Sequence, residues 1–259
     1  MYWLILISLL GCKKPPPEAP KELNELSRYL FREWDNEDPL VMQAGVENLR
    51  DFLADLDLEG KVNDRSFTLD PIREDDLDVD HPDRDPEDCL NVSVARKSEW
   101  PVDDHAQLQI ESDQTPTEPT AKDYLRTFPK EDDPDCLPDH DCGVLETVND
   151  IRRENLLMSI SFELFKDFRW VELDGEEDAL VARSWIDQSW AGDNGKNWVY
   201  QSFSVDIWIA SNDAAWRYQI LSSETEVGVD DEDVVAGFLK GSIDNIMKKG
   251  DKAIETLYH

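Results

Sequence analysis

Two consecutive runs near the C-terminal end decide the fold: Trp198-Val199-Tyr200-Gln201-Ser202-Phe203-Ser204-Val205-Asp206-Ile207-Trp208-Ile209-Ala210 and, after Ser211-Asn212-Asp213, the stretch from Ala214 to Val227. In the first run apolar residues from Phe203 to Ile209 occupy every second position, which is the period of a half-buried strand. Asn and Asp favour turns. The sequence therefore predicts two antiparallel strands joined by residues 211–213.

Two further strands precede this pair. Apolar residues alternate with polar ones from Met158 to Leu164, and a second strand runs from Val181 to Ile186. The loop 191–197 that follows contains Asn194-Gly195, a pair that tolerates the positive φ of a hairpin turn. Together the four runs predict an antiparallel meander.

A long helix is predicted after the meander. Acidic residues from Asp230 to Asp233 suit its positive N-terminal end. Apolar residues then recur at helical spacing: Val234, Val235, Phe238, Leu239, Ile243, Ile246, Met247, Ile254 and Leu257. Strands followed by a packed helix favour the α+β class.

A helical hairpin is predicted at the other end of the domain. Residues 21–34 carry leucines at helical spacing, and a second helix begins at Pro39 after Asp38, a favourable N-cap. Gly60 supplies its C-terminal stop. We expect this hairpin to cover a sheet.

The segment 64–141 lacks a clear period. It is dense in Asp and Pro, with short apolar runs at Ser66–Leu69, Leu90–Ala95 and His105–Ile110. We expect one or two strands between long acidic loops, which in proteins are either functional or disordered. The interpretation is one acidic domain over residues 21–259.

The order of elements, a meander followed by a long terminal helix, is similar in outline to helix-grip (START-like) domains. The resemblance implies a curved sheet wrapped around a helix and an apolar cavity between them. Fold analogy alone assigns no function.

Length and charge exclude some classes of function. The 259 residues carry 59 acidic and 26 basic side chains, a net charge of −33, with a pI of about 4.2. Such a surface repels phosphates, so nucleic acid is not an expected partner. It disfavours a polybasic grip on anionic lipids in the same way.

The first residues resemble the lipobox of bacterial lipoproteins. An apolar run over residues 1–11 ends in Leu9-Leu10-Gly11-Cys12, and a Pro-rich stretch follows to Pro20. The run has the length of a signal-peptide apolar region and is too short to span a bilayer. The resemblance implies removal of residues 1–11, acylation of Cys12 (with palmitate, for example), a tether over residues 12–20 and an exported domain anchored to a bacterial membrane. A plain secretory signal or a buried strand ending at a free Cys is the alternative.

An Asp-rich loop is a candidate calcium site. Asp76, Asp78, Asp80 and Glu87 stand at positions 1, 3, 5 and 12 of an EF-hand-like spacing, which would bring hard oxygens to one ion. The alternative is a solvated acidic loop.

Cysteines 89, 136 and 142 remain once Cys12 is set aside. In an oxidising compartment Cys136 and Cys142 can pair across the short loop between them, and Cys89 with either partner is an equal alternative. Zinc held by Cys136, Cys142 and His140 is a third interpretation.

The last candidates are a groove and a hydrolase site. Trp198, Tyr200 and Trp208 share one face of their predicted strand, where they form either core or a groove for an apolar ligand or a sugar. Paired carboxylates of a hydrolase are another hypothesis, although nothing selects a pair, and the sequence has no nucleophile or metalloprotease motif. The sequence thus favours an envelope lipoprotein that binds a ligand or partner without catalysis, with calcium-dependent interaction and hydrolysis as alternatives.

Overall fold

The computed structural model describes residues 18–129, 133–154, 159–175, 178–229 and 231–259. The predicted signal peptide, the lipobox with Cys12, and the strand and helix residues Met158 and Asp230 lie outside this part of the chain. The helices and strands are α1 Leu23–Arg32, α2 Pro39–Leu58, β1 Arg65–Leu69, β2 Leu90–Ser98, α3 Val102–Gln109, β3 Ala121–Thr127, β4 Leu145–Glu154, β5 Ser159–Glu172, β6 Asp178–Trp185, β7 Trp190–Ala191, β8 Trp198–Ser211, β9 Ala214–Glu226 and α4 Glu232–Tyr258. No helix in the described ranges is both long and apolar enough to cross a membrane.

All strands of the described residues belong to one antiparallel sheet of nine strands in the order β1-β2-β9-β8-β6-β5-β4-β3, with β7 paired to β8. The predicted meander is confirmed, because four strands lie side by side in the sheet in the order in which they follow along the chain: β5, β6, β8 and β9. The turns also form as expected, with positive φ at Asn212 and Gly195. The fold class α+β is confirmed.

The segment 64–141 contains more structure than its sequence indicates. Strands β1 and β2 contain the apolar runs 66–69 and 90–95, whereas the run 105–110 belongs largely to helix α3. The sequence predicts neither strand β3 nor strand β4, which follows this segment. Both strands carry polar side chains on their inner face, so they lack the alternation of apolar and polar residues that marks a strand. Arg126 and Asn149, for example, are buried and bonded to each other, Nε to Oδ1, at 2.8 Å.

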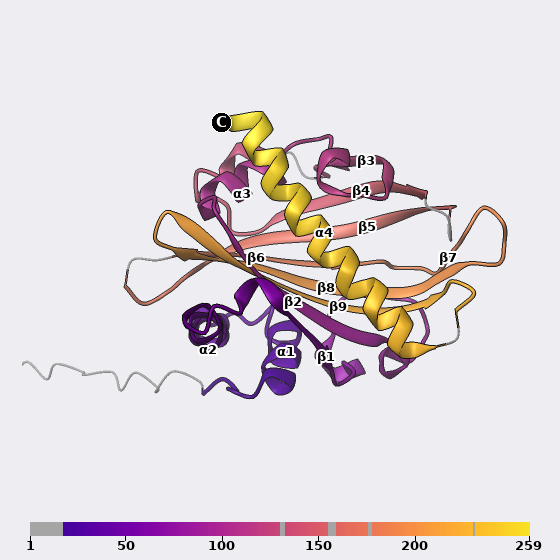
Figure 1. Cartoon of the computed structure of the whole chain (residues 1–259), viewed down its shortest axis with the longest axis horizontal. Helices are drawn as coiled ribbons and strands as arrows, with labels where there is room; N and C mark the ends of the chain where they lie inside the picture. Colours follow the sequence, from indigo (N-terminus) through magenta and orange to yellow (C-terminus); the bar gives the residue numbers. More distant parts are fainter. Residues whose placement is uncertain (1–17, 130–132, 155–158, 176–177, 230) are drawn as a thin grey trace, which may run out of the picture.

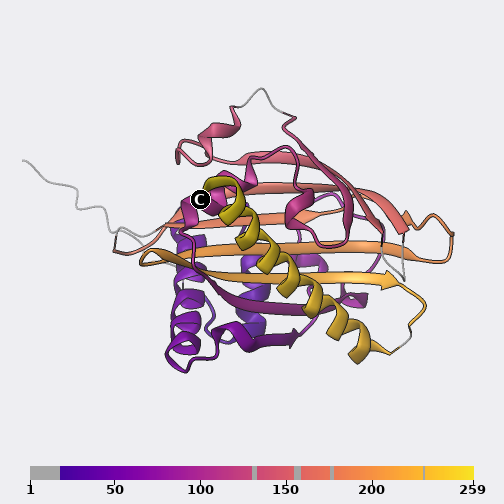
Figure 2. The ribbon, with the colours of Figure 1, turned by 45° about the horizontal axis from the view of Figure 1, so that its top comes forward.

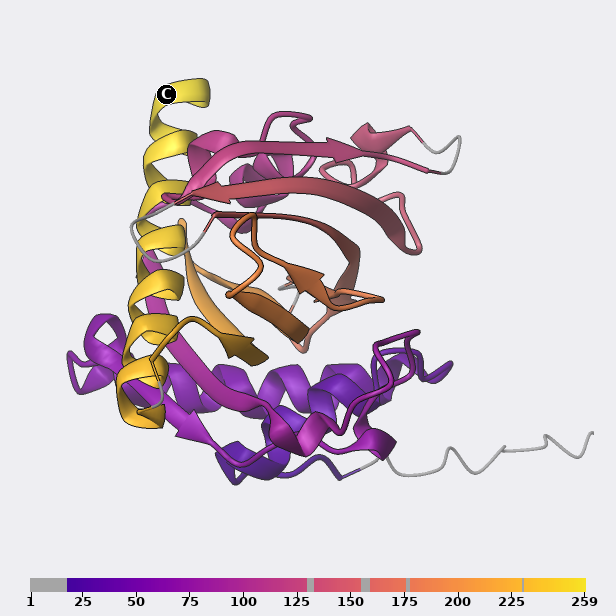
Figure 3. The ribbon, with the colours of Figure 1, turned by 90° about the vertical axis from the view of Figure 1, so that its right-hand side faces the viewer.

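Helices α1 and α2 form the predicted hairpin and cover the outer, convex face of the sheet (Figure 3). The Asp38 side chain accepts a hydrogen bond from the amide of Leu40 at the start of α2, as the N-cap prediction requires. Leu30 and Leu49 are fully buried against alternate residues of β8 such as Val205 and Ile207. The aliphatic side of β8 therefore faces the hairpin.

Helix α4 lies diagonally across the opposite, concave face (Figures 1 and 2). Its N-cap residue Asp231 accepts a hydrogen bond from the amide of Val234. Ile243 and Met247 pack on Val92 and Val94 of β2, and Ile254 packs on Leu108 of α3. The sheet curls around this helix, which spans the open side of the curve in Figure 3.

Candidate ligand-binding site

A cavity of about 500 Å³ lies between the concave face of the sheet and α4. Side chains from β3, β4, β5, β6, β8, β9 and α4 line it, together with the connection between α3 and β3. Its volume falls in the range of about 300–1,000 Å³ typical of small-molecule sites. It exists because α4 rests on β2 and β9 at one side and on α3 at its C-terminal end.

The half of the cavity near the start of α4 is mostly apolar, apart from the Arg153 guanidinium, which lies 5.2 Å from the ring centroid of Phe162. Val199 and Phe162 belong to a buried cluster here, and the half-exposed Phe238 of α4 lines the same space. Gly237 and Gly241 of α4 also line it, and a Cβ atom added at either glycine would have no other atom within 4 Å. A side chain larger than hydrogen at either position would therefore project into open space at the rim of the cavity.

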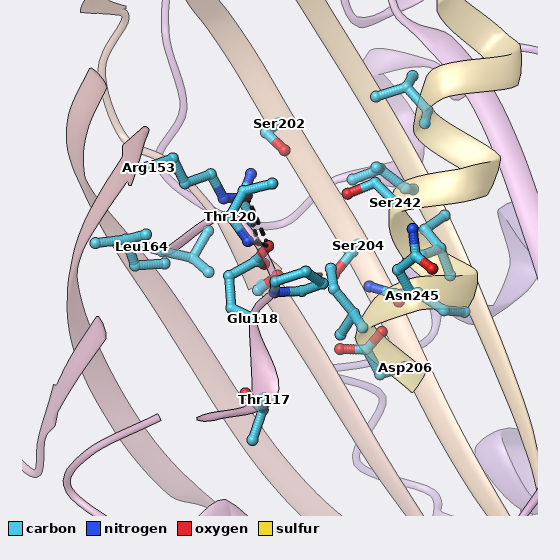
Figure 4. A pocket seen from close by; sticks show the side chains of 18 of the residues that line it. Thr117, Glu118, Thr120, Arg153, Leu164, Ser202, Ser204, Asp206, Ser242 and Asn245 are labelled. Carbon is cyan, nitrogen blue, oxygen red and sulfur yellow. Dashed lines mark hydrogen bonds and ion pairs between the residues drawn. The ribbon is translucent and has the colours of Figure 1, made fainter. Parts of the chain in front are cut away.

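The floor of the cavity is polar. Lys166, Ser184, Ser204 and Leu221 are paired across β5, β6, β8 and β9, so they form one row on the concave face. The hydroxyls of Ser184 and Ser204 are 2.7 Å apart. In the close-up of Figure 4, Ser202, Ser204 and Asp206 project from β8.

One wall holds an ion pair. Arg153 Nη2 of β4 lies 2.9 Å from Glu118 Oε2, and Glu118 is 4 % exposed. The same carboxylate accepts a hydrogen bond from the Thr120 hydroxyl at 2.9 Å (Figure 4). Ser242 and Asn245 of α4 line the cavity on the helix side.

The half near the end of α4 gathers charged and aromatic groups. Lys166 Nζ forms an ion pair with Asp206 and lies 5.4 Å from the ring centroid of Phe168 and 5.8 Å from that of Trp208. Arg217 donates from Nη1 to the Met247 carbonyl at 2.8 Å and to Asp251 at 3.2 Å. Burial lowers the pKa of Arg217, with the Asp251 and Asp206 charges acting in the opposite direction.

The three aromatic residues predicted to form a groove are divided between the two faces of the sheet. Trp208 lines the cavity, whereas Trp198 and Tyr200 do not and stack on each other with ring centroids 5.6 Å apart. The register of β8 against β9 shifts between Val199 and Gln201, which is a bulge. A bulge reverses which residues face inward, so Val199 rather than Trp198 reaches the cavity.

The four predicted calcium ligands do not converge. Asp76 is fully buried, and its carboxylate accepts hydrogen bonds from Arg28 Nε at 2.7 Å and from the Arg73 amide at 2.9 Å. Asp78, Asp80 and Glu87 are exposed. No group of three or more His, Cys, Asp or Glu side chains suited to a metal occurs in the described ranges. The position that begins the EF-hand-like spacing serves to neutralise a buried arginine.

The cysteines form the first of the predicted arrangements. Cys136 and Cys142 are joined in a disulfide with Cα atoms 5.1 Å apart, and Cys89 is free and buried. This pairing excludes zinc on the two thiolates. His140 instead stacks on Trp170, with ring centroids 3.7 Å apart, and lies within 3.1 Å of Asp103.

The cavity carboxylates are both committed to ion pairs, Glu118 with Arg153 and Asp206 with Lys166. Burial raises the pKa of Asp167, which lies outside the cavity and pairs with Arg183 at 3.1 Å. A carboxyl with a raised pKa inside a cleft is a candidate functional residue, and Asp167 does not line this cavity.

Several cavity residues escape sequence reasoning: Arg126, Arg153, Lys166, Asp206 and Arg217. Each stands at a polar position of a strand, where the same alternation describes a solvent-facing side. One feature of the sequence could have pointed to these cavity residues. It is the presence of a Lys or Arg on the polar side of a strand in a chain that is otherwise strongly acidic.

Comparison with known proteins finds no match to a family model and none to a curated protein. Among solved structures, similarity is found to a STAR-related lipid transfer protein from Xanthomonas axonopodis (8 % identity, 65 % of this chain, 87 % of that chain, TM-score 0.46). A START superfamily protein from Mycobacterium smegmatis matches at 12 % identity, over 64 % and 98 % of the two chains, with a TM-score of 0.43. Human STARD10 matches at 9 % identity over 82 % and 80 %, with a TM-score of 0.40. At these values the similarities assign no function to this chain.

Proposed function

We propose that this protein binds a small ligand with a large apolar part in the cavity between the sheet and α4, without catalysing a reaction on it. The observation that carries the proposal is a cavity of about 500 Å³ that has both apolar and polar walls. Binding sites for small molecules are concave and mostly apolar, with a few placed polar groups. The ion pairing of both cavity carboxylates supports binding rather than acid–base chemistry.

Filling the cavity tests this proposal. Ser202 lies on the cavity side of β8 and is half-buried, so Ser202→Trp places a large ring in the space while keeping a residue that strands favour. The matched control is Ser66→Trp, an exposed position on β1. We expect Ser202→Trp to lose most of the binding of an uncharged apolar fluorophore such as N-phenyl-1-naphthylamine. Equal binding by both variants contradicts the proposal.

We further propose that Cys12 is lipidated and that it holds the domain on a bacterial membrane after export. Support comes from the lipobox-like residues 9–12 and from the Pro-rich stretch that follows. Two or more acyl chains, each contributing about 0.8 kcal/mol per buried methylene, hold a soluble domain on a bilayer stably. The chain becomes attached to the domain near Ala19, where Asn48 Nδ2 donates to the carbonyls of Ala19 and Pro20.

Labelling cells with radioactive palmitate tests the anchor. We expect label in the wild-type protein and in Cys89→Ser, both in the membrane fraction, and none in Cys12→Ser. Label that persists in Cys12→Ser, or its absence from the wild type, contradicts lipidation at Cys12.

A further inference from the structure

The charge of the cavity walls is the reverse of the charge of the chain. Acidic residues outnumber basic ones 59 to 26 over the whole sequence. Among the residues that line the cavity, cations outnumber carboxylates: Arg126, Arg153, Lys166 and Arg217 against Glu118 and Asp206. A surface with this composition concentrates positive charge where a ligand would lie.

Three of these cations have carboxylate partners, and the fourth has none among the described residues. Arg153 pairs with Glu118, Lys166 with Asp206, and Arg217 with Asp251. Arg126 is 3 % exposed and makes no ion pair with any described residue. A buried charge without a partner is costly, so an anion placed beside Arg126 would stabilise it.

The hydrogen bonds of Arg126 leave donor capacity. Its Nε donates to Asn149 Oδ1, and its Nη1 to the carbonyl and side-chain oxygens of Gln109, all neutral acceptors. Among the described residues, the one acceptor for Nη2 is the Tyr124 hydroxyl at 3.4 Å. Because each guanidinium Nη carries two hydrogens, Nη2 retains an N–H for a ligand. Burial lowers the pKa of Arg126, with Tyr124 and the Asp206 charge acting in the opposite direction.

Other buried donors on the cavity walls are also short of acceptors. Trp208 Nε1, Arg217 Nε and Arg153 Nε are buried and have no hydrogen-bond partner within the part of the chain that the structure describes. Trp208 is 3 % exposed and Arg217 7 %. Among the described side chains that line the cavity, no buried acceptor oxygen is without a hydrogen-bond partner. These donors therefore lack acceptors, which an oxyanion supplies and an ammonium group does not.

Arg153 lies in the half near the start of α4, with its guanidinium 5.2 Å from the ring centroid of Phe162, whereas the other donors gather at the opposite end of the cavity. The Arg126 guanidinium lies 5.2 Å from the ring centroid of Phe168, on which Lys166 also sits, and Arg217 lies 5.7 Å from that of Trp208. The apolar residues near the start of α4, such as Phe238, belong to the other half. A ligand with one acidic end and one hydrocarbon end matches this division.

We propose that the ligand is a long-chain amphiphile with an oxyanion head group, a carboxylate or a phosphate monoester, held at Arg126 and Trp208 with its chain toward Phe238. This inference rests on the proposed binding function and specifies its ligand class. The remaining N–H of Arg126 Nη2 and the indole N–H of Trp208 can each donate to an oxygen of either oxyanion.

A comparison of ligands with one chain length tests the inference on the unaltered cavity. The assay uses the full chain carrying Cys12→Ser, a variant in which every described residue is unchanged. It measures how well each of three ligands displaces the uncharged fluorophore: palmitate, hexadecyl phosphate and hexadecanol. We expect one or both acids to bind at least about ten-fold more tightly than the alcohol, as for a hydrogen bond to a charged group. Preference for palmitate or for hexadecyl phosphate identifies the head group.

The outcomes separate this inference from the function on which it rests. Equal affinity for the acids and the alcohol overturns the inference but leaves the proposed function standing. If neither the fluorophore nor any of the three amphiphiles binds, the proposed function fails.

Two variants then locate the head group. Arg126→Met and Trp208→Phe should each weaken binding of the acids by a larger factor than binding of hexadecanol, because they remove donors and keep most of the apolar volume. Arg152→Met and Trp198→Phe are the matched controls, since both residues lie outside the cavity lining. Acid affinities unchanged in both cavity variants overturn the assignment. If Arg126→Met fails to fold, Trp208→Phe and the wild-type comparison still decide.

Discussion

The buried Asp76 allows the sharpest test of how this fold is held together. Its carboxylate is fully buried, bonded to Arg28 through Nε at 2.7 Å and Nη2 at 3.3 Å, and lies 3.6 Å from Arg32 Nη1. The pair joins α1 to the short 3₁₀ turn Glu74–Asp76 across a sequence separation of 48 residues. We choose Asp76→Asn because it keeps the size of the side chain and removes its charge.

The expected loss of unfolding free energy follows from the groups that remain around Arg28 in Asp76→Asn. Arg28, whose side chain is 7 % exposed, would face an uncharged amide, and its other carboxylate neighbour, Glu25, is 3.5 Å away and more than half exposed. Breaking a buried ion pair by removing one partner costs about 3–5 kcal/mol. Because Glu25 compensates part of the charge, we expect about 3 kcal/mol of lost unfolding free energy.

Urea unfolding followed by tryptophan fluorescence measures this loss. With a slope of about 3 kcal/mol per molar urea, the midpoint should fall by about 1 M. The control is Asp78→Asn, which removes the same charge from an exposed residue of the same loop and should change stability by less than about 0.5 kcal/mol.

Calcium provides the second arm of this experiment. If the loop held calcium through Asp76 and Asp78, both variants would abolish a calcium-dependent rise in the midpoint. The structure leads us to expect the same midpoint with calcium and with a chelator. A loss below about 1 kcal/mol in Asp76→Asn, well short of the cost of breaking a buried pair, or similar losses in both variants, would refute the role given to the ion pair.

Two further predictions concern buried titratable groups. His105 is 1 % exposed, and burial holds its pKa well below 6.5, with Arg217 acting in the same direction. As the pH falls, the histidine is protonated in the unfolded chain before it is protonated in the folded protein. The free energy of unfolding is therefore unaffected by this group above about pH 6.5, and below it falls by up to about 1.4 kcal/mol per pH unit. His105→Gln should flatten this slope between about pH 6.5 and pH 5, and an unchanged slope would contradict the assignment. Burial raises the pKa of the free Cys89 thiol to about 12, so a thiol reagent at about pH 8 should label it only after unfolding, and rapid labelling of the native protein would show that it is accessible.

Local patterns in the sequence were sufficient for the elements that border the cavity. Alternation in Phe203–Ile209 indicated β8, Asn194-Gly195 and Asn212 marked its turns, and the acidic start of α4 was followed by its apolar stripe. These signals are short in range, because each depends on side chains a few positions apart on one strand or helix. The same reasoning offered the pairing of Cys136 with Cys142, six residues apart, as one of its alternatives.

Tertiary structure alone decided which polar residues are inside. Asp206 and Lys166 have the alternation of a solvent-facing side. They are enclosed by α4, which packs on β2, and by the connection between α3 and β3. Local patterns could not reveal the partner of Asp76 for a related reason, since Arg28 is 48 residues away. The sequence by itself thus determined the meander, the helices around it and the strong negative charge of the chain. The cavity and its cations were decided by contacts between distant segments, because burial depends on which element covers a face and not on the period of that face.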